Sequence, residues 1–301
     1  MDRELLPHLP VVLAVARRRS FVAAAAELGM GASAVSHAVR AVEDRLGTAL
    51  FARTTRSVSL TEAGATFLAA VEPALAQVAD ATERVRADSG RVTGLLRLNA
   101  PRVALPIALT PILAALARRH PDLTVEITSD DALTDIVAHG FDAGIRLGEM
   151  IAQDMVAVRL TPPFQAILVA APEYVAVRGA PASVRELRQH NCIGLRLMSA
   201  GGVYAWDLLE AGKDVAVDVH GSVLVTDPSY ARDLALAGVG VAYVFEPLVR
   251  AELRAKRLVW LLPEAAITEP GLFIYFPQRL LRVPKLRAFL DTAKELARVG
   301  S

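Results

Sequence analysis

The sequence predicts an N-terminal winged helix-turn-helix joined by a long helix to a larger α/β domain. Three observations predict this fold class. Apolar residues recur at helical spacing through residues 5–88, a basic hairpin interrupts that helical run, and short strands alternate with helices beyond residue 94. With 301 residues, of which 53% are hydrophobic, the chain is long enough for about two or three domains with their own cores. The alternation favours mostly parallel α/β layers.

The N-terminal part is predicted to begin with three helices. The first covers the apolar repeat of residues 5–16. Ser20 is a favourable N-cap for a second, alanine-rich helix over residues 21–28. The third runs over residues 32–46 and ends at Gly47. In a helix-turn-helix the second helix of the motif presents short polar and basic side chains to the DNA major groove while its other face packs on the first.

The helix over residues 32–46 meets that requirement. Its apolar face carries regularly spaced valines, and the opposite face carries four polar or basic residues, namely Ser33, Ser36, His37 and Arg40. These residues and Ser20 are candidate DNA contacts. The alternative for the serines is that they are ordinary solvated helix residues. Arg17 to Arg19 end the first helix, where basic charge favours the helix dipole, so a structural role is expected for them.

A hairpin is predicted over residues 50–61, with Arg53, Thr54 and Arg56 near its tip. Such a tip suits a phosphate backbone or a minor groove, although the arginines are also compatible with ordinary surface charge. Residues 1–60 hold eight Arg against five acidic residues, a local excess of three positive charges, whereas the whole chain carries a net charge of +1. The basic balance is therefore local, and it lies where the motif lies.

A longer helix follows over residues 62–88, with Thr61 as its N-cap and Pro73 inside it, where a bend is expected. Its apolar residues step by three and four as in a heptad seam, which favours pairing with a second helix. The alternative is a helix that packs on its own domain. The resulting domain boundaries are 1–61 for the winged helix-turn-helix, 62–90 for the linker and dimerisation helix, and 91–301 for the remainder.

The remainder is expected to contain nine strands and six helices. The strands are expected over residues 95–99, 123–128, 142–147, 167–171, 192–197, 215–225, 239–245, 258–262 and 271–276. The helices are expected over residues 101–120, 131–138, 183–189, 228–237 and 246–255, with a final one over 284–298 that makes a sixth.

Many of these residues together resemble the signature of the LysR-type transcriptional regulators. The matched positions run at fixed spacing from Ser20-Phe21 through Ala34-Val35-Ser36, Val42-Glu43, Leu46-Gly47, Leu50-Phe51, Arg53 and Arg56 to Leu60-Thr61-Glu62-Ala63-Gly64. The segment over residues 140–148 is similar to the effector domain of that family, in the variant of the subgroup around the CrgA and AphB regulators. The sequence departs from the family at Gly31, Ala32 and His37, which leaves the DNA sequence read by the helix open.

The resemblance implies a transcription regulator whose C-terminal part is a two-lobed, periplasmic-binding-protein-like effector domain. Lobe one is expected over residues 91–161 and 268–301, and lobe two over residues 162–267. A small ligand is then expected between the lobes. Closure of the lobes around this ligand is expected to change the angle between paired DNA-binding domains and so the spacing of the half-sites that they bind. The family also implies homodimers or homotetramers and makes RNA polymerase a candidate partner beside double-stranded DNA.

Ends of strands that meet beginnings of helices supply the candidate effector residues, because backbone N–H groups at those junctions attract anions. The candidates are Ala100, Pro101, Arg102, Thr128, Ser129, Arg146, Arg196, Thr226, Asp227 and Phe245. The three arginines favour a small anion. Two alternatives stay open: Thr226 and Asp227 are equally typical of helix caps, and Arg146 is equally typical of a structural ion pair.

Other classes of protein are disfavoured. The sequence has no G-x-S-x-G, no Walker loop and no His or Cys set at metal-ligand spacing, so no enzyme activity, cofactor or metal is expected. Residues 1–60 disfavour a solute-binding module without regulatory output. A single cysteine, Cys192, excludes an internal disulfide. The longest apolar stretch, residues 103–117, contains two prolines and is too short for a membrane span, so a cytoplasmic protein is expected.

Overall fold

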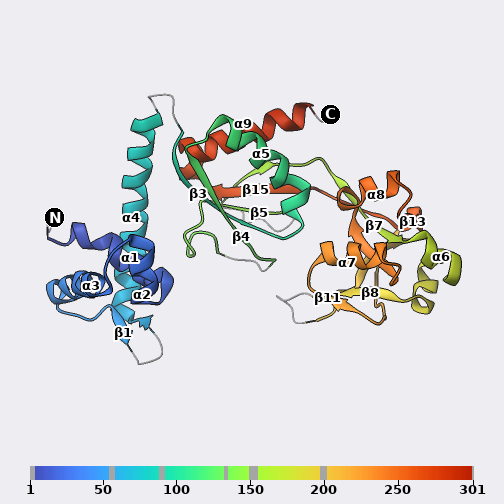
Figure 1. Ribbon diagram of the computed structural model, residues 1–301, viewed down its shortest axis with the longest axis horizontal. Coiled ribbons are helices and arrows are strands. Elements are labelled where there is room, and N and C mark those ends of the chain that lie inside the picture. The colour runs from blue at the N-terminus through green and yellow to red at the C-terminus, as the bar shows by residue number, and fades with distance from the viewer. Residues whose placement is uncertain are drawn as a thin grey trace. The chain divides into compact units, whose positions relative to one another are not determined.

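The computed structural model describes residues 4–53, 58–87, 92–131, 135–148, 155–196 and 202–299. The chain divides into two compact units, Met1–Ser89 and Gly90–Ser301. The first is a helical unit with one hairpin, and the second contains two β-sheets with helices packed on them (Figure 1).

The N-terminal unit has the order of elements that the sequence predicts. Its elements are the 3₁₀ turn η1 (Leu6–His8), α1 (Leu9–Arg18), α2 (Phe21–Leu28), α3 (Ala32–Leu46), β1 (Phe51–Arg53), β2 (Val58–Leu60) and α4 (Glu62–Ala87). Gly29 and Gly47 end α2 and α3 in the left-handed region, at φ of 64° and 65°, which glycine adopts without steric strain. The apolar faces of α1, α2 and α3 form one core with the hairpin root.

The first half of helix α4 packs against this core. Leu68 is 5% exposed, and Leu75 packs against the same core, so this half follows the alternative of packing on its own domain. Val78, one turn further on, is 63% exposed. Helix α4 continues through Pro73 as one element. Pairing with a second copy along the later heptad positions stays a prediction.

The first sheet of the C-terminal unit has the strand order β4-β3-β5-β15-β6. Helices α5 and α9 cover one of its faces (Figure 1), and their apolar side chains share a core with the sheet. We call this sheet with its helices lobe one. Its elements are β3 (Gly94–Ala100), the π-helical turn η2 (Leu105–Leu109), α5 (Thr110–Arg119), β4 (Leu123–Ser129), β5 (Ala143–Leu147), β6 (Met155–Arg159), β15 (Leu272–Pro277), η7 (Gln278–Arg282) and α9 (Pro284–Val299).

The second sheet has the order β11-β8-β12-β7-β13, and β14 also pairs with β7. We call it, with its helices and a separate β9–β10 hairpin, lobe two. Its elements are β7 (Phe164–Ala170), α6 (Pro172–Arg178), η4 (Val184–Gln189), β8 (Cys192–Leu195), β9 (Trp206–Glu210), β10 (Lys213–Val217), β11 (Leu224–Val225), α7 (Pro228–Leu236), β12 (Val241–Phe245), η5 (Glu246–Leu248), α8 (Arg250–Arg254), β13 (Val259–Leu261), η6 (Pro263–Ala265) and β14 (Ile267–Glu269).

The prediction of mostly parallel layers is wrong. Strand β3 is parallel to β4 and β5, and β8 is parallel to β11 and β12, but β15 is antiparallel to both of its neighbours and β7 is antiparallel to β12, β13 and β14. Strand β15 enters lobe one from lobe two instead of from a crossover helix, so nothing in its connection requires the parallel direction.

Several predicted elements are divided or replaced. The strand expected over 215–225 is two strands, β10 and β11, with irregular backbone between them. The helix expected over 101–120 begins as a π-helical turn at Leu105. Pro106 and Pro111 fall within this run, and a proline inside a helix removes one N–H from its hydrogen-bond ladder. Of the helix expected over 131–138, residues 132–134 lie outside the described residues and 136–140 form a turn.

Candidate nucleic-acid interface and ligand site

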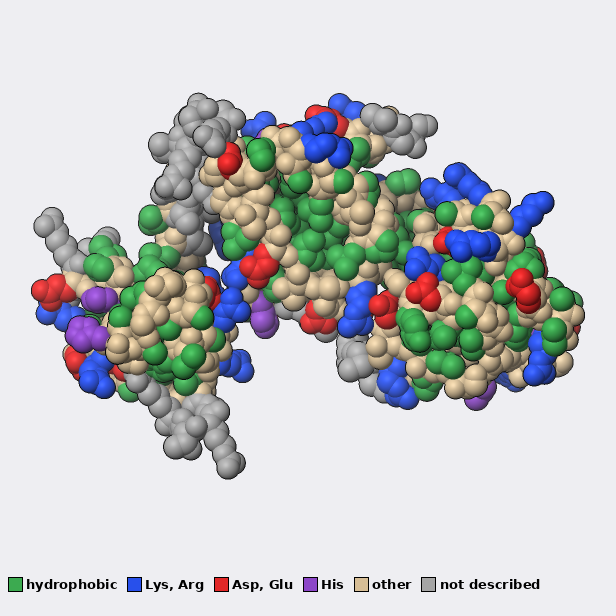
Figure 2. Space-filling model, viewed as in Figure 1, with side chains coloured by type: hydrophobic (Ala, Val, Ile, Leu, Met, Phe, Trp, Pro, Cys, Tyr) green, Lys and Arg blue, Asp and Glu red, His purple; other side chains and the backbone are tan. Residues whose placement is uncertain are grey.

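Helix α3 carries the candidate DNA contacts on its exposed side. Its valines face the core and are fully buried. Ser33, His37 and Arg40 are exposed, and Ser36 is half-buried. The side chains suited to base edges therefore point away from the protein interior, as the sequence predicts. Figure 2 shows basic and acidic side chains interspersed on one face of this unit. Contact with DNA stays a prediction.

Ser20 and the hairpin complete the candidate surface. The Ser20 Oγ accepts a hydrogen bond from the backbone N–H of Ala23 at 3.2 Å and so caps α2 at its N-terminus, where the helix dipole favours a phosphate. Strands β1 and β2 pair antiparallel, and Arg53 ends β1. Thr54 and Arg56 lie outside the described residues.

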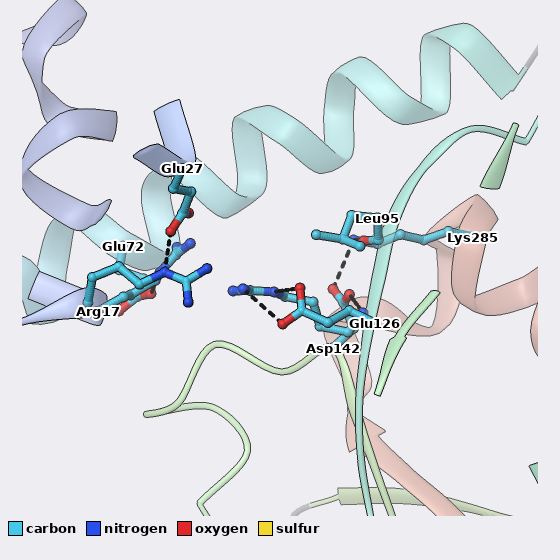
Figure 3. A network of polar contacts seen from close by, with 9 residues as sticks. Arg17, Glu27, Glu72, Leu95, Glu126, Asp142 and Lys285 are labelled. Carbon is cyan, nitrogen blue, oxygen red and sulfur yellow. Dashed lines mark hydrogen bonds and ion pairs between the residues drawn. The ribbon is translucent and has the colours of Figure 1, made fainter. Parts of the chain in front are cut away.

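Two of the three arginines at the end of α1, Arg17 and Arg18, have ion-pair partners within the N-terminal unit. The Arg17 guanidinium pairs with Glu72 of α4 at 3.2 Å, and that of Arg18 pairs with Glu27 of α2 at 2.5 Å (Figure 3). The first pair joins the first half of α4 to α1. Exposed pairs such as these add little stability, so their effect is mainly on orientation.

Arg146 of β5 is a buried arginine in the sheet of lobe one. Arg146 is 2% exposed, and its guanidinium donates to the Asn99 Oδ1 at 2.6 Å and to the Ile145 carbonyl at 2.7 Å. Burial lowers the pKa of Arg146, whereas Tyr275, Asp130 and Asp131 act in the opposite direction. The Nδ2 of Asn99, which is 1% exposed, has no hydrogen-bond partner among the described residues. Both acceptors of the Arg146 guanidinium named here are neutral groups, and they hold its side chain in the sheet.

Arg102 connects the two lobes. Its backbone N–H donates to the Asp131 Oδ1 at 3.0 Å, and its Nη1 donates to the Asp131 Oδ2 at 3.2 Å. The same Nη1 donates to the carbonyl of Thr226, at the start of α7, at 3.1 Å. Arg102 and Thr226, both predicted as effector residues, therefore meet where β3 and β11 end.

The other candidate effector residues differ in their contacts and in their exposure to solvent. The Ala100 carbonyl accepts from the Asp130 N–H at 3.0 Å, which joins the ends of β3 and β4. Asp227 caps α7, since its Oδ1 accepts from the Ser229 N–H at 2.8 Å. The remaining positions are Pro101, half-buried after β3; Thr128 and Ser129, exposed at the end of β4; Arg196, exposed after β8; and Phe245, whose ring packs on Phe164 at 5.1 Å.

Sequence reasoning missed two residues that organise these sites. Asp131 holds Arg102, and Glu43 of α3 accepts hydrogen bonds from the N–H groups of Leu50 and Phe51. Asp131 lies two residues after the end of β4, in a position where Asp is common because its side chain accepts hydrogen bonds from nearby backbone N–H groups. Glu43 belongs to the matched family signature, but nothing in its spacing indicates a partner seven residues ahead.

Metal and membrane sites find no support in the part of the chain that the structure describes. No group of three or more His, Cys, Asp or Glu residues could hold a metal ion there. No single described helix is long and apolar enough to cross a membrane, and only the bent pair α2 and α3 reaches that length and composition together.

Comparison with known proteins assigns both units. Residues 6–65 match the model of the bacterial regulatory helix-turn-helix protein of the lysR family, and residues 89–298 match the LysR substrate binding domain. Two relatives from Escherichia coli (strain K12) are similar over nearly the full length. The HTH-type transcriptional regulator YcaN is 38% identical over 93% of this chain and 92% of its own, and PgrR is 35% identical over 98% of both.

A solved structure supports the same assignment. CrgA, a LysR-type transcriptional regulator from Neisseria meningitidis, is 28% identical, with a TM-score of 0.61 over 96% of this chain and 98% of that chain. These relatives are regulators and not enzymes. The chain therefore belongs to the LysR family and is a DNA-binding transcription regulator with an effector-binding domain.

Proposed function

We propose that the protein binds operator DNA as a homodimer or homotetramer and that a small anion, bound between the two lobes, controls this binding. The observation that carries the proposal is the Arg102 contact, in which one guanidinium joins Asp131 of lobe one to the Thr226 carbonyl of lobe two. A group that binds there acts on both lobes at once.

A carboxylate or phosphate suits Arg102 better than the carbonyl that it now contacts. Hydrogen bonds between two charged groups are roughly twice as strong as neutral ones, and a planar guanidinium can bind a carboxylate through two of them. Asp131 already orients Arg102, so the ligand meets a positioned donor. The buried Arg146 adds positive charge beneath the same strand ends. The proposed effector contacts are Ala100, Pro101, Arg102, Thr128, Ser129, Arg146, Arg196, Thr226, Asp227 and Phe245.

The test of the effector site compares Arg102→Ala with Arg97→Ala. Both arginines belong to the same segment of lobe one, but the side chain of Arg97 pairs with Glu126 at 3.3 Å, within the same sheet. A panel of small carboxylates and phosphate esters is screened for an increase in melting temperature. We expect compounds that stabilise the wild type to stabilise Arg97→Ala equally and to lose their effect on Arg102→Ala. An Arg102→Ala chain that responds like the wild type contradicts the proposal.

The proposed DNA contacts are Ser20, Ser33, Ser36 and His37, with Arg40 on α3, and Arg53, Thr54 and Arg56 of the hairpin. Loss of a side chain that reads a base edge weakens binding to the preferred sequence by about 1–3 kcal/mol, whereas loss of a phosphate contact weakens binding to all sequences alike. The affinity of Arg40→Ala is measured for an operator duplex, selected from a random library by the wild type, and for random duplex DNA. A loss confined to the operator indicates a base contact, and an equal loss on both indicates a phosphate contact. We propose that the protein binds chromosomal DNA in the cytoplasm, with RNA polymerase as a candidate partner.

A further inference from the structure

We propose that Glu43 is a positioning residue for DNA binding, which fixes the hairpin, or wing, against α3 so that both contact DNA in one geometry. The proposal rests on the proposed DNA contacts of the wing and α3. It assigns to Glu43 no contact with DNA.

The carboxylate of Glu43 holds the root of the wing directly. One oxygen, Oε1, accepts hydrogen bonds from the backbone N–H groups of Leu50 at 2.8 Å and Phe51 at 3.1 Å. Phe51 is the first residue of β1, and both residues are buried, with Leu50 fully so. A charged acceptor makes the stronger class of hydrogen bond. The last turns of α3 and the first strand of the wing are therefore joined by a side chain and not only by the connecting loop.

A second set of contacts holds the same segment from the other side. The Leu50 carbonyl accepts from the Thr61 N–H at 3.0 Å, and the Thr61 hydroxyl donates to the Ala49 carbonyl at 2.7 Å. Gly64 of α4 lies so close to Leu50 that a Cβ on it would come within 2.1 Å of the Leu50 carbonyl oxygen. The segment of residues 49–51, which we call the wing root, is thus held by α3 through Glu43 and by α4 through Thr61 and Gly64.

The geometry disfavours a reading of DNA bases by Glu43. A glutamate on a recognition helix can accept a hydrogen bond from cytosine, but only if its oxygens reach the groove. Here Oε1 already accepts from two N–H groups, and the residue is half-buried one turn behind the exposed Arg40. What Glu43 determines is where the wing lies when α3 is in the groove.

The experiment measures salt-dependent affinity of the full-length protein for one duplex, selected from a random library by the wild type. The variants are Glu43→Ala, Glu43→Gln and the wing variant Arg53→Ala with Arg56→Ala. Asp44→Ala is the matched control, since it removes the same charge from the adjacent exposed position. Each phosphate contact contributes about 5-fold in affinity near 0.15 M salt through counterion release, so loss of about two wing contacts predicts a decrease of roughly 30-fold and a salt slope lower by about 2.

We expect Glu43→Ala to reproduce the wing variant in both affinity and slope, while Asp44→Ala binds at least as well as the wild type. Combining Glu43→Ala with the wing variant is expected to add little, because the contacts that Glu43 positions are already gone. If Glu43→Ala acted only by lowering stability, its effect on affinity would be the same with and without the wing arginines. Melting curves establish that each variant is folded. If Glu43→Ala does not fold, Glu43→Gln serves instead, with weaker hydrogen bonds and a smaller decrease in the same slope.

Two results would overturn the proposal, and they differ. Suppose that the wing variant weakens binding but Glu43→Ala leaves the salt slope unchanged, or that the affinity losses of the two variants multiply when they are combined. In either case Glu43 does not act through the wing. If the wing variant binds like the wild type, the proposed DNA contacts of the wing fail first, and the role of Glu43 fails with them.

Discussion

Replacing Lys285 by Met should destabilise the effector-binding domain by about 3 kcal/mol. Lys285, at the start of α9, contacts the Asp142 Oδ1 at 3.0 Å and donates to the Leu95 carbonyl at 2.8 Å (Figure 3). The other oxygen of Asp142 accepts from the Arg97 N–H at 2.8 Å. The Lys285 and Asp142 side chains are 10% and 17% exposed, so this pair is largely shielded from water.

The magnitude follows from what the substitution leaves behind. Breaking a buried ion pair from one side costs about 3–5 kcal/mol, because the remaining charge stays buried without its partner. Asp142 keeps the Arg97 N–H and some contact with water, so the lower end of the range applies. In a domain of this size about 3 kcal/mol corresponds to a decrease of roughly 6–12 °C in melting temperature.

Urea unfolding followed by tryptophan fluorescence measures this change in the right part of the chain, because both tryptophans, Trp206 and Trp260, belong to the effector-binding domain. Lys294→Met is the control, since Lys294 is exposed on the same helix. Adding Asp142→Asn to Lys285→Met should recover part of the loss, because the uncompensated charge is removed. A loss below about 1 kcal/mol for Lys285→Met, or no recovery in the double variant, would refute the reasoning.

Three further predictions concern other parts of the chain. Burial raises the pKa of the Cys192 thiol to about 12, so the folded protein should resist thiol reagents near pH 8. Its free energy of unfolding should fall as the pH rises above about 9, because the thiol then ionises in the unfolded chain but not in the folded one. The fall should be smaller in Cys192→Ala. Gly64→Ala should destabilise the N-terminal unit by at least about 2 kcal/mol, measured by its melting. Gly31→Ala, whose Cβ would lie 3.8 Å from Ser33, should cost less than about 1 kcal/mol, which is the effect of alanine at the N-cap of α3. Asp227→Ala should lower the stability of the effector-binding domain by about 1 kcal/mol in urea, and Asp227→Asn should preserve it; equal loss in both would exclude the cap as the cause.

Local signals predicted the N-terminal unit closely. Helices α2 and α3 begin and end where the caps at Ser20, Gly29 and Gly47 indicate, because a cap acts through neighbouring backbone groups that the sequence places directly. The two-lobed organisation came from resemblance to a family, since strand periodicity does not state which strands pair. Strand direction was mispredicted for the same reason: β15 takes its neighbours from strands more than a hundred residues earlier.

The candidate effector site was less predictable than the fold. The sequence indicated which strand ends carry arginines, but not that Arg146 is buried against Asn99 while Arg102 reaches across to Thr226. Burial of a charged side chain depends on all the elements packed around it, and those are set by tertiary structure. The role of Glu43 was hidden in the same way, because a hydrogen bond from a helix to a loop leaves no periodic trace.

The position of β15 has a consequence for how the chain is made. This strand lies between β5 and β6, so the sheet of lobe one lacks an interior strand until the ribosome has passed Pro277. The strands of lobe two are contiguous in the sequence and are complete earlier. During synthesis β5 and β6 therefore wait with unpaired edges, which are the sites where nascent chains associate wrongly. A chain that stops before Leu272 is expected to aggregate, even though its DNA-binding unit and lobe two are intact.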